Sequence, residues 1–243
     1  MPKKTADIDF AKQDQKTDPD WTPTGDTPNE SLPTPSGFWD DMEGEQDNRG
    51  IQLPRLSLIH PLDKRAEEFK AGRFVYNNEV ELESPFQMVA IKTKKGYFEK
   101  IDRKLNPTGI SRIVWSAAEV RSMGGSLDYP CPPDAMPFGD MAELLILISQ
   151  SKDDKGLFPF EFEGKSWAPA SYRVKGTAYT RVFKILEAAR ALSLRQGLIY
   201  GRWSVSTVKE TVNNNQTYVP VVKFSGKNSP EYVDWLKDLL KGF

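Results

Sequence analysis

The most apolar stretch of this chain is MAELLILISQ, residues 141–150. Its length suits a strand, and a run that is apolar at nearly every position is typical of a strand covered on both faces of its sheet. No apolar run approaches the length of about eighteen residues that a membrane-spanning helix needs. We therefore predict that residues 141–150 form the central strand of a sheet.

Further strand-like runs occur in pairs around turn residues, which is typical of antiparallel hairpins. In residues 86–101 two such runs flank Lys94, Lys95 and Gly96, where the glycine favours a turn. The other predicted hairpins comprise residues 72–83 around Asn77 and Asn78, residues 141–163 around 151–156, and residues 198–224 around 213–215.

Two helices are predicted. Residues 167–197 carry apolar side chains at three- and four-residue steps, and residues 230–240 follow Ser229, a favourable N-cap. The polar side of the longer helix includes Arg173 and Lys175, a row that is more typical of a solvated helix face than of a nucleic-acid track. Together these elements predict an α+β fold, in which antiparallel β-hairpins form an OB-like partly closed barrel with one long helix and a C-terminal helix.

Residues 1–50 differ in composition from the rest. They contain five Lys or Arg and twelve Asp or Glu, which leaves 28 basic and 22 acidic residues for 51–243. Low apolar content and repeated prolines predict a disordered acidic N-terminal arm before a single α+β OB-like domain, residues 51–243. Trp21, Phe38 and Trp39 lie among the acids, which fits either a docking motif or a solubilising tail.

The residue inventory excludes several kinds of site. Cys131 and His60, the only cysteine and histidine, cannot form a Cys/His zinc cluster, and His60 has no nucleophile motif beside it. Neither a GxxxxGK[ST] nor a GxGxxG loop occurs. We expect no cofactor, no metal and no enzymatic activity. Because the first residues lack the apolar core of a signal peptide, we expect a cytoplasmic protein.

A basic segment with aromatic residues is the strongest functional signal. Cations along single-stranded nucleic acid follow the phosphates while aromatic rings stack on unpaired bases, and residues 92–104 supply both. The alternative is a solvated lysine-rich turn whose rings point into the core. The predicted nucleic-acid-binding residues are Lys92, Lys94, Lys95, Lys100, Arg103 and Arg202 for phosphates, with Tyr97, Phe98, Trp203 and Tyr218 for stacking.

The order of several phrases supports the same class. LPRLSLIHP, the W-x-P-A-S of residues 167–171, the predicted long helix, and GRWSVSTVKETVNNNQTYVPVVKFSG before a short helix follow one another. In this order the chain resembles bacteriophage-encoded single-stranded DNA-binding or replication-associated proteins with an OB-type core, over roughly residues 53–224. LPRLSLIH and TYVPVVKF are its most specific phrases. Members carry cysteine pairs where this chain has only Cys131, and the acidic tail common at the C-terminus of such proteins corresponds here to an N-terminal arm.

The resemblance implies a non-enzymatic protein that binds single-stranded DNA during phage DNA replication or recombination, in the host cytoplasm. Replication or recombination proteins are possible partners through the acidic arm, and the arm could also compete with DNA for the basic groove. A phage structural or assembly protein, whose arm wraps a neighbouring subunit in a homo-oligomer, is the alternative. A metal-dependent nuclease is a more distant third, because no carboxylate constellation supports it.

Overall fold

The computed structural model describes residues 53–102, 110–150, 156–212 and 215–241. The predicted N-terminal arm and Arg103 lie outside the described residues. The strands are β1 (Arg55–Leu58), β2 (Phe74–Tyr76), β3 (Val80–Glu81), β4 (Phe86–Glu99), β5 (Ile113–Val114), β6 (Gly125–Ser126), β7 (Met136–Gln150), β8 (Phe160–Phe162), β9 (Lys165–Lys175), β10 (Gly201–Val212) and β11 (Asn215–Lys227). The helical segments are η1 (Lys64–Glu67), α1 (Ala117–Ser122), the π-helical turn η2 (Tyr179–Phe183), α2 (Lys184–Leu192), η3 (Leu198–Tyr200) and α3 (Pro230–Leu240).

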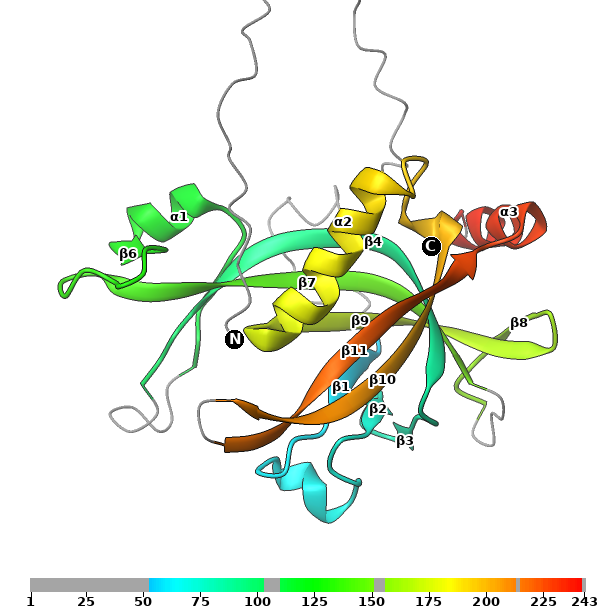
Figure 1. Cartoon of the computed structure of the whole chain (residues 1–243), viewed down its shortest axis with the longest axis horizontal. Coiled ribbons are helices and arrows are strands. Elements are labelled where there is room, and N and C mark those ends of the chain that lie inside the picture. Colours follow the sequence, from blue (N-terminus) through cyan, green and yellow to red (C-terminus); the bar gives the residue numbers. More distant parts are fainter. Residues whose placement is uncertain (1–52, 103–109, 151–155, 213–214, 242–243) are drawn as a thin grey trace, which may run out of the picture. The chain divides into compact units, whose positions relative to one another are not determined.

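A mixed sheet curled into a half-barrel dominates this part of the chain, and α2 lies across it (Figure 1). Its strand order is β11-β10-β4-β7-β9-β1-β2-β3, with β5 added beside β4, β6 beside β7 and β8 beside β9. Most pairs are antiparallel, but β1 runs parallel to β9 and β6 runs parallel to β7. The long strand β7 pairs with β4 on one side and β9 on the other, which confirms the prediction of a central strand.

The curl brings the β1–β2 connection against the far hairpin, β10–β11. His60 Nδ1 lies 3.0 Å from the Thr217 hydroxyl, and the Thr207 hydroxyl donates to the carbonyl of Gly72 at 2.7 Å. The Tyr218 ring covers Gly72, whose positive φ of 87° suits a glycine. Side-chain contacts, rather than a strand ladder, therefore hold these two ends of the sheet together.

The two faces of the sheet carry separate cores. On the face that we call inner, Met88, Ile146 and Tyr172 belong to a large buried cluster that also includes Leu186 of α2. Thr93 confirms the position of α2, since its hydroxyl donates to Glu187 at 2.9 Å. The opposite face, which we call outer, has a smaller cluster where α3 packs over the ends of β4, β7 and β9, formed by Val89, Leu147, Trp167, Tyr232 and Leu236.

The predicted turn at Lys94, Lys95 and Gly96 is wrong, because β4 continues through all three residues and pairs with β7 along its length. Gly96 serves a different purpose from a turn glycine. A Cβ at this position would stand 2.7 Å from the Trp115 ring, so the absent side chain lets that ring lie on the strand. The chain reverses only later, and Ile113–Val114 returns as β5 beside Tyr97 and Phe98.

The helix predicted over residues 167–197 is wrong in its first part, where the chain forms β9. Ala168, Ala170 and Val174 alternate into the inner core, and pairing with β7 satisfies the backbone on that side. Helix begins only at η2 and continues through α2. The hairpin predicted for 141–163 is also wrong, since β8 pairs with β9 instead of β7, and residues 151–155 lie outside the described residues.

Other local predictions are confirmed. Asn77 and Asn78, both with positive φ, form the turn between β2 and β3. The predicted last hairpin is the β10–β11 pair, and Ser229 caps α3 by accepting from the Tyr232 N–H at 3.2 Å. These features were predictable because turn and cap preferences depend on neighbours in sequence, not on the tertiary fold.

The contact between Gly72 and Tyr218 predicts a stability difference between two glycine substitutions. Gly72→Ala and Gly164→Ala both place an L side chain at positive φ, but only Gly72 has a ring where its Cβ would stand, 2.5 Å away. We expect Gly72→Ala to lower the free energy of unfolding by about 1–3 kcal/mol more than Gly164→Ala does, because it adds overpacking to backbone strain. Chemical denaturation measures both, and equal losses would contradict the proposed closure contact.

Candidate nucleic-acid interface

The register of β4 separates the cations that the sequence places side by side. Lys94 pairs with Glu143, while Lys95 pairs with Ala142, a member of the inner core. Because successive side chains of a strand point to opposite faces, Lys92 and Lys94 project from the outer face and Lys95 from the inner face. A bulge between Ala90 and Lys92 sets this alternation for the second half of β4.

Neighbouring strands add cations to the same side. Arg173 and Lys175 of β9 pair with Glu143 and Met141 of β7, so they lie on the outer face beside the β4 lysines. Arg55 of β1 pairs with Ser171 and continues the row. We call this surface the outer basic face; it consists of Arg55, Lys92, Lys94, Phe98, Lys100, Trp115, Arg173 and Lys175.

Two aromatic rings lie among these cations. The Lys94 ammonium is 4.9 Å from the centroid of the Trp115 ring, and the Lys175 ammonium is 5.3 Å from that of Phe98. Both rings cover glycines of the sheet, because Phe98 lies over Gly139 as Trp115 lies over Gly96. The Lys100 side chain also reaches over Gly139. Both rings are only half-buried, so part of each remains accessible.

The cations of the outer basic face are only partly compensated, by Glu143 beside Arg173 and by the Glu119 carboxylate near the Lys94 charge. Glu143 is its central carboxylate; it pairs with Arg173 at 3.2 Å, accepts from the Ser171 hydroxyl at 2.8 Å, and its side chain is only 12% exposed. The ion pairs within the described ranges involve no other cation of this face. Unpaired cations that crowd one surface create a positive field, which attracts polyanions.

A short capping motif fixes Trp115 at the rim of this face. Ser116 caps α1 and forms a capping box with Glu119. Glu119 accepts from the backbone N–H groups of Trp115 and Ser116 at 2.8 and 3.0 Å. These hydrogen bonds, with the nearby Lys94 charge, hold the pKa of Glu119 below its ordinary value.

Several predicted residues lie elsewhere. Lys95 and Tyr97 are on the inner side, where the Lys95 ammonium lies 3.3 Å from Asp140 and 5.3 Å from the Tyr97 centroid. They cannot act together with Lys94, because the sheet separates them. Trp203 is only 1% exposed and belongs to the inner core, so its predicted stacking role is wrong. Tyr218 packs on Gly72, far from β7 in the strand order.

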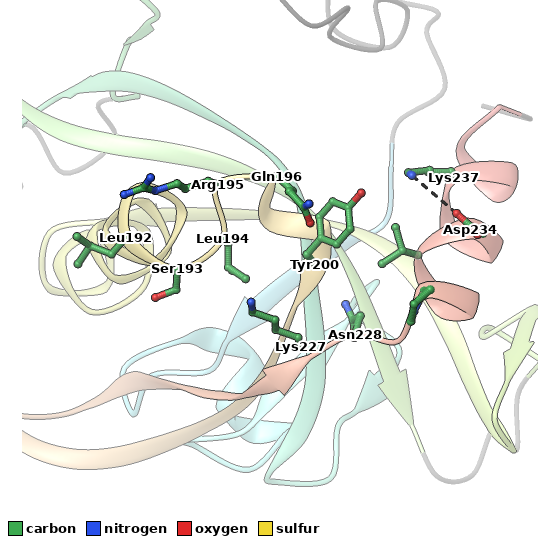
Figure 2. Close-up of a pocket in the computed structure, with 12 residues that line it drawn as sticks. Leu192, Ser193, Leu194, Arg195, Gln196, Tyr200, Lys227, Asn228, Asp234 and Lys237 are labelled. Atoms are coloured by element: carbon green, nitrogen blue, oxygen red, sulfur yellow. Dashed lines mark ion pairs between the residues drawn. The ribbon is translucent and has the colours of Figure 1, made fainter.

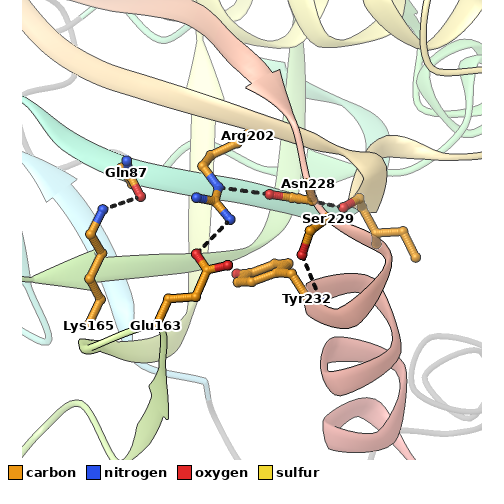
Figure 3. A network of polar contacts seen from close by, with 8 residues as sticks. Gln87, Glu163, Lys165, Arg202, Asn228, Ser229 and Tyr232 are labelled. Atoms are coloured by element: carbon orange, nitrogen blue, oxygen red, sulfur yellow. Dashed lines mark hydrogen bonds and ion pairs between the residues drawn. The ribbon is translucent and has the colours of Figure 1, made fainter.

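Arg202 lies on the outer side of the sheet, but its contacts hold helix α3 in place (Figure 3). Its guanidinium lies 5.1 Å from the centroid of the Tyr232 ring, donates to Asn228 at 2.9 Å and approaches Glu163 at 3.5 Å. Asn228 in turn donates to the carbonyl of Ile199 at 2.7 Å. These contacts give Arg202 a structural role at α3, and its predicted phosphate contact stays a prediction.

Of the predicted residues, Lys92, Lys94, Phe98 and Lys100 come together on the outer basic face. The prediction missed Trp115, and it assigned Arg173 and Lys175 to a helix face. The alternation Ser-Tyr-Arg-Val-Lys over residues 171–175 is the signal that could have placed these two cations on one face of a strand.

Comparisons with known proteins and a search for metal sites add no assignment. No family model, curated protein or solved structure matches the chain. In the part of the chain that the structure describes, no three His, Cys, Asp or Glu side chains group as a metal site. None of the helices among the described residues is long and apolar enough to cross a membrane. The functional argument therefore depends on the geometry of the outer basic face.

The capping box predicts an acid-dependent loss of stability. Because the pKa of Glu119 is lower in the folded protein, its carboxylate stabilises the fold above its ordinary pKa, and this contribution disappears as the pH falls through the folded value. In Glu119→Gln the side chain keeps an acceptor but carries no charge. We expect the difference in free energy of unfolding between wild type and variant to shrink from pH 7 to pH 3. A difference that stays constant across this range would contradict the assignment.

The network at α3 predicts that Arg202→Ala affects folding and not ligand binding. Removing the guanidinium leaves the buried Asn228 carboxamide without its donor, so we expect the free energy of unfolding to fall by about 1–3 kcal/mol. Affinity for a single-stranded oligonucleotide, measured by fluorescence anisotropy under conditions where the variant is folded, should change less than twofold. A large loss of affinity in folded Arg202→Ala would restore Arg202 as a binding residue.

Proposed function

We propose that this protein binds single-stranded DNA on its outer basic face, as a non-enzymatic protein of phage DNA replication or recombination. The observation that carries the proposal is the combination of unpaired lysines with the accessible rings of Phe98 and Trp115 on one surface. Such cations contact phosphates, and such rings stack on bases.

The arrangement of the rings favours a single strand over a duplex. Phe98 projects from β4 and Trp115 from the bend between β5 and α1, and both rings lie on the sheet surface between lysines, each over a glycine, so neither projects outward to enter a groove. A single strand can turn its bases toward a sheet and its phosphates toward the surrounding cations, as paired bases cannot. The bound DNA strand would run beside α3, which covers the other end of the same face.

The half-barrel would act as an OB-like scaffold, in which a curled sheet presents one face to the strand. This likeness and the phage origin follow from the resemblance of the sequence, and together with the expected cytoplasmic location they belong to the proposal. Single-stranded DNA also occurs where replication takes place, which agrees with that location. The alternative role in assembly depends on residues 1–50, which lie outside the described residues.

A titration with fluorescent oligo-dT at several salt concentrations tests the proposal. If about five cations contact phosphates, the logarithm of the association constant should fall with the logarithm of salt concentration with a slope of about −3.5. Lys94→Ala should reduce that slope by about 0.7, because one phosphate contact is lost. Trp115→Leu keeps an apolar cover on Gly96 but loses the stacking surface, so affinity should fall about tenfold or more.

Lys95→Gln is the matched control. Its residue is adjacent in sequence, and its ion pair with Asp140 is solvent-exposed, but it projects from the other face. We expect its affinity and salt slope to equal those of the wild type. If Lys95→Gln weakened binding as much as Lys94→Ala, or if the affinity did not depend on the salt concentration, the outer basic face would not be the site.

A further inference from the structure

A second site is visible away from the outer basic face. A pocket of about 490 Å³ opens where the end of α2, η3, the end of β11 and the first turns of α3 meet (Figure 2). Its volume lies within the range of small-molecule sites, about 300–1,000 Å³. None of its lining residues belongs to the outer basic face, and its side chains are not explained by the proposed DNA contact.

The pocket combines cations with hydrogen-bonding groups and an aromatic ring. Lys227 of β11, Lys237 of α3 and Arg195 of the turn after α2 supply positive charge, and Asp234 is the acidic residue of the lining. Asp234 lies 3.8 Å from Lys237, so its charge is partly compensated. The net charge of the lining is therefore positive.

Tyr200 lies at the centre of the pocket. Figure 2 shows its ring beside the Gln196 carboxamide, with Lys227 and Asn228 below it and the Lys237–Asp234 pair on the side of α3. The Arg195 side chain extends along the end of α2 at the other end of the pocket. The Lys237 ammonium lies 5.8 Å from the centroid of the Tyr200 ring, so a cation faces the planar ring, and the Gln196 carboxamide lies beside it.

These groups match the parts of a nucleotide. An aromatic ring offers a surface for a base, a carboxamide such as that of Gln196 can bond the edge of the base, and lysine or arginine binds the phosphate. The buried Asn228 is held in place, because its oxygen accepts from Arg202 and its nitrogen donates to Ile199. An acidic peptide would bring carboxylates toward Asp234, and it would need a longer groove than a pocket of this size.

We infer that this pocket binds one nucleoside monophosphate, with the base against Tyr200 and the phosphate at Lys227. The inference does not depend on the proposed function, since the two sites share no residue.

Isothermal titration of the full chain with adenosine 5′-monophosphate tests the inference, with adenosine and inorganic phosphate as comparison ligands. We expect the monophosphate to bind at least about tenfold more tightly than either part, because base and phosphate are bound together. Lys227→Ala and Tyr200→Leu should each weaken binding about tenfold, whereas Tyr200→Phe should retain it. Lys223→Ala, an exposed lysine of β11 outside the pocket, is the matched control.

The outcomes separate the two sites. Lys94→Ala combined with Trp115→Leu should leave monophosphate binding unchanged, and oligo-dT binding by this double variant tests the outer basic face alone. Equal affinity for inorganic phosphate and for the monophosphate would show a plain anion site and overturn the inference. Absence of monophosphate binding, or binding that Lys227→Ala and Tyr200→Leu leave intact, would also overturn it. Binding of the peptide FWDDMEGE, residues 38–45, in place of the nucleotide would also overturn the inference if that binding depended on Lys227.

Discussion

The pairing of β7 with β4 and β9 is the constraint on which the rest of this structure depends. Every backbone group on both edges of a buried strand needs a partner, and β7 obtains them along nearly its whole length from the two neighbours. Its apolar side chains then define two cores, one on each face of the sheet. Helix α2 packs on the inner face and α3 on the outer face, and each buries its one apolar side there.

The same pairing decides which charged groups act together. Alternation along β4 sends Lys94 outward and Lys95 inward, although the two are neighbours in sequence. Pairing with β9 then adds Arg173 and Lys175 from a segment about eighty residues away along the chain. A surface with this composition arises from register, and a shift of one residue in β4 would exchange the two sets of side chains.

One part of the outer face is covered by a helix and supports the fold, and another part carries the proposed binding site. Toward one end, α3 covers the sheet, and Arg202 stacked on Tyr232 helps to fix that helix. Toward the other end no helix of the described residues packs on the outer face, and glycines at Gly96 and Gly139 let rings lie directly on the strands. Apolar side chains under a helix and charged side chains on an open surface thus occupy the same face of the same three strands.

The sequence by itself determined the central strand, the turn at Asn77 and Asn78, the β10–β11 hairpin and the capped helix α3. Each depends on local preferences or on a run of one residue type. It also indicated the basic and aromatic composition that the proposed site uses. Only the tertiary structure decided that β4 does not turn at Gly96, which strands pair with β9, and which cations share a face. The physical reason is that strand pairing joins segments distant in sequence, so register and the packing of Trp115 on Gly96 have no local signal.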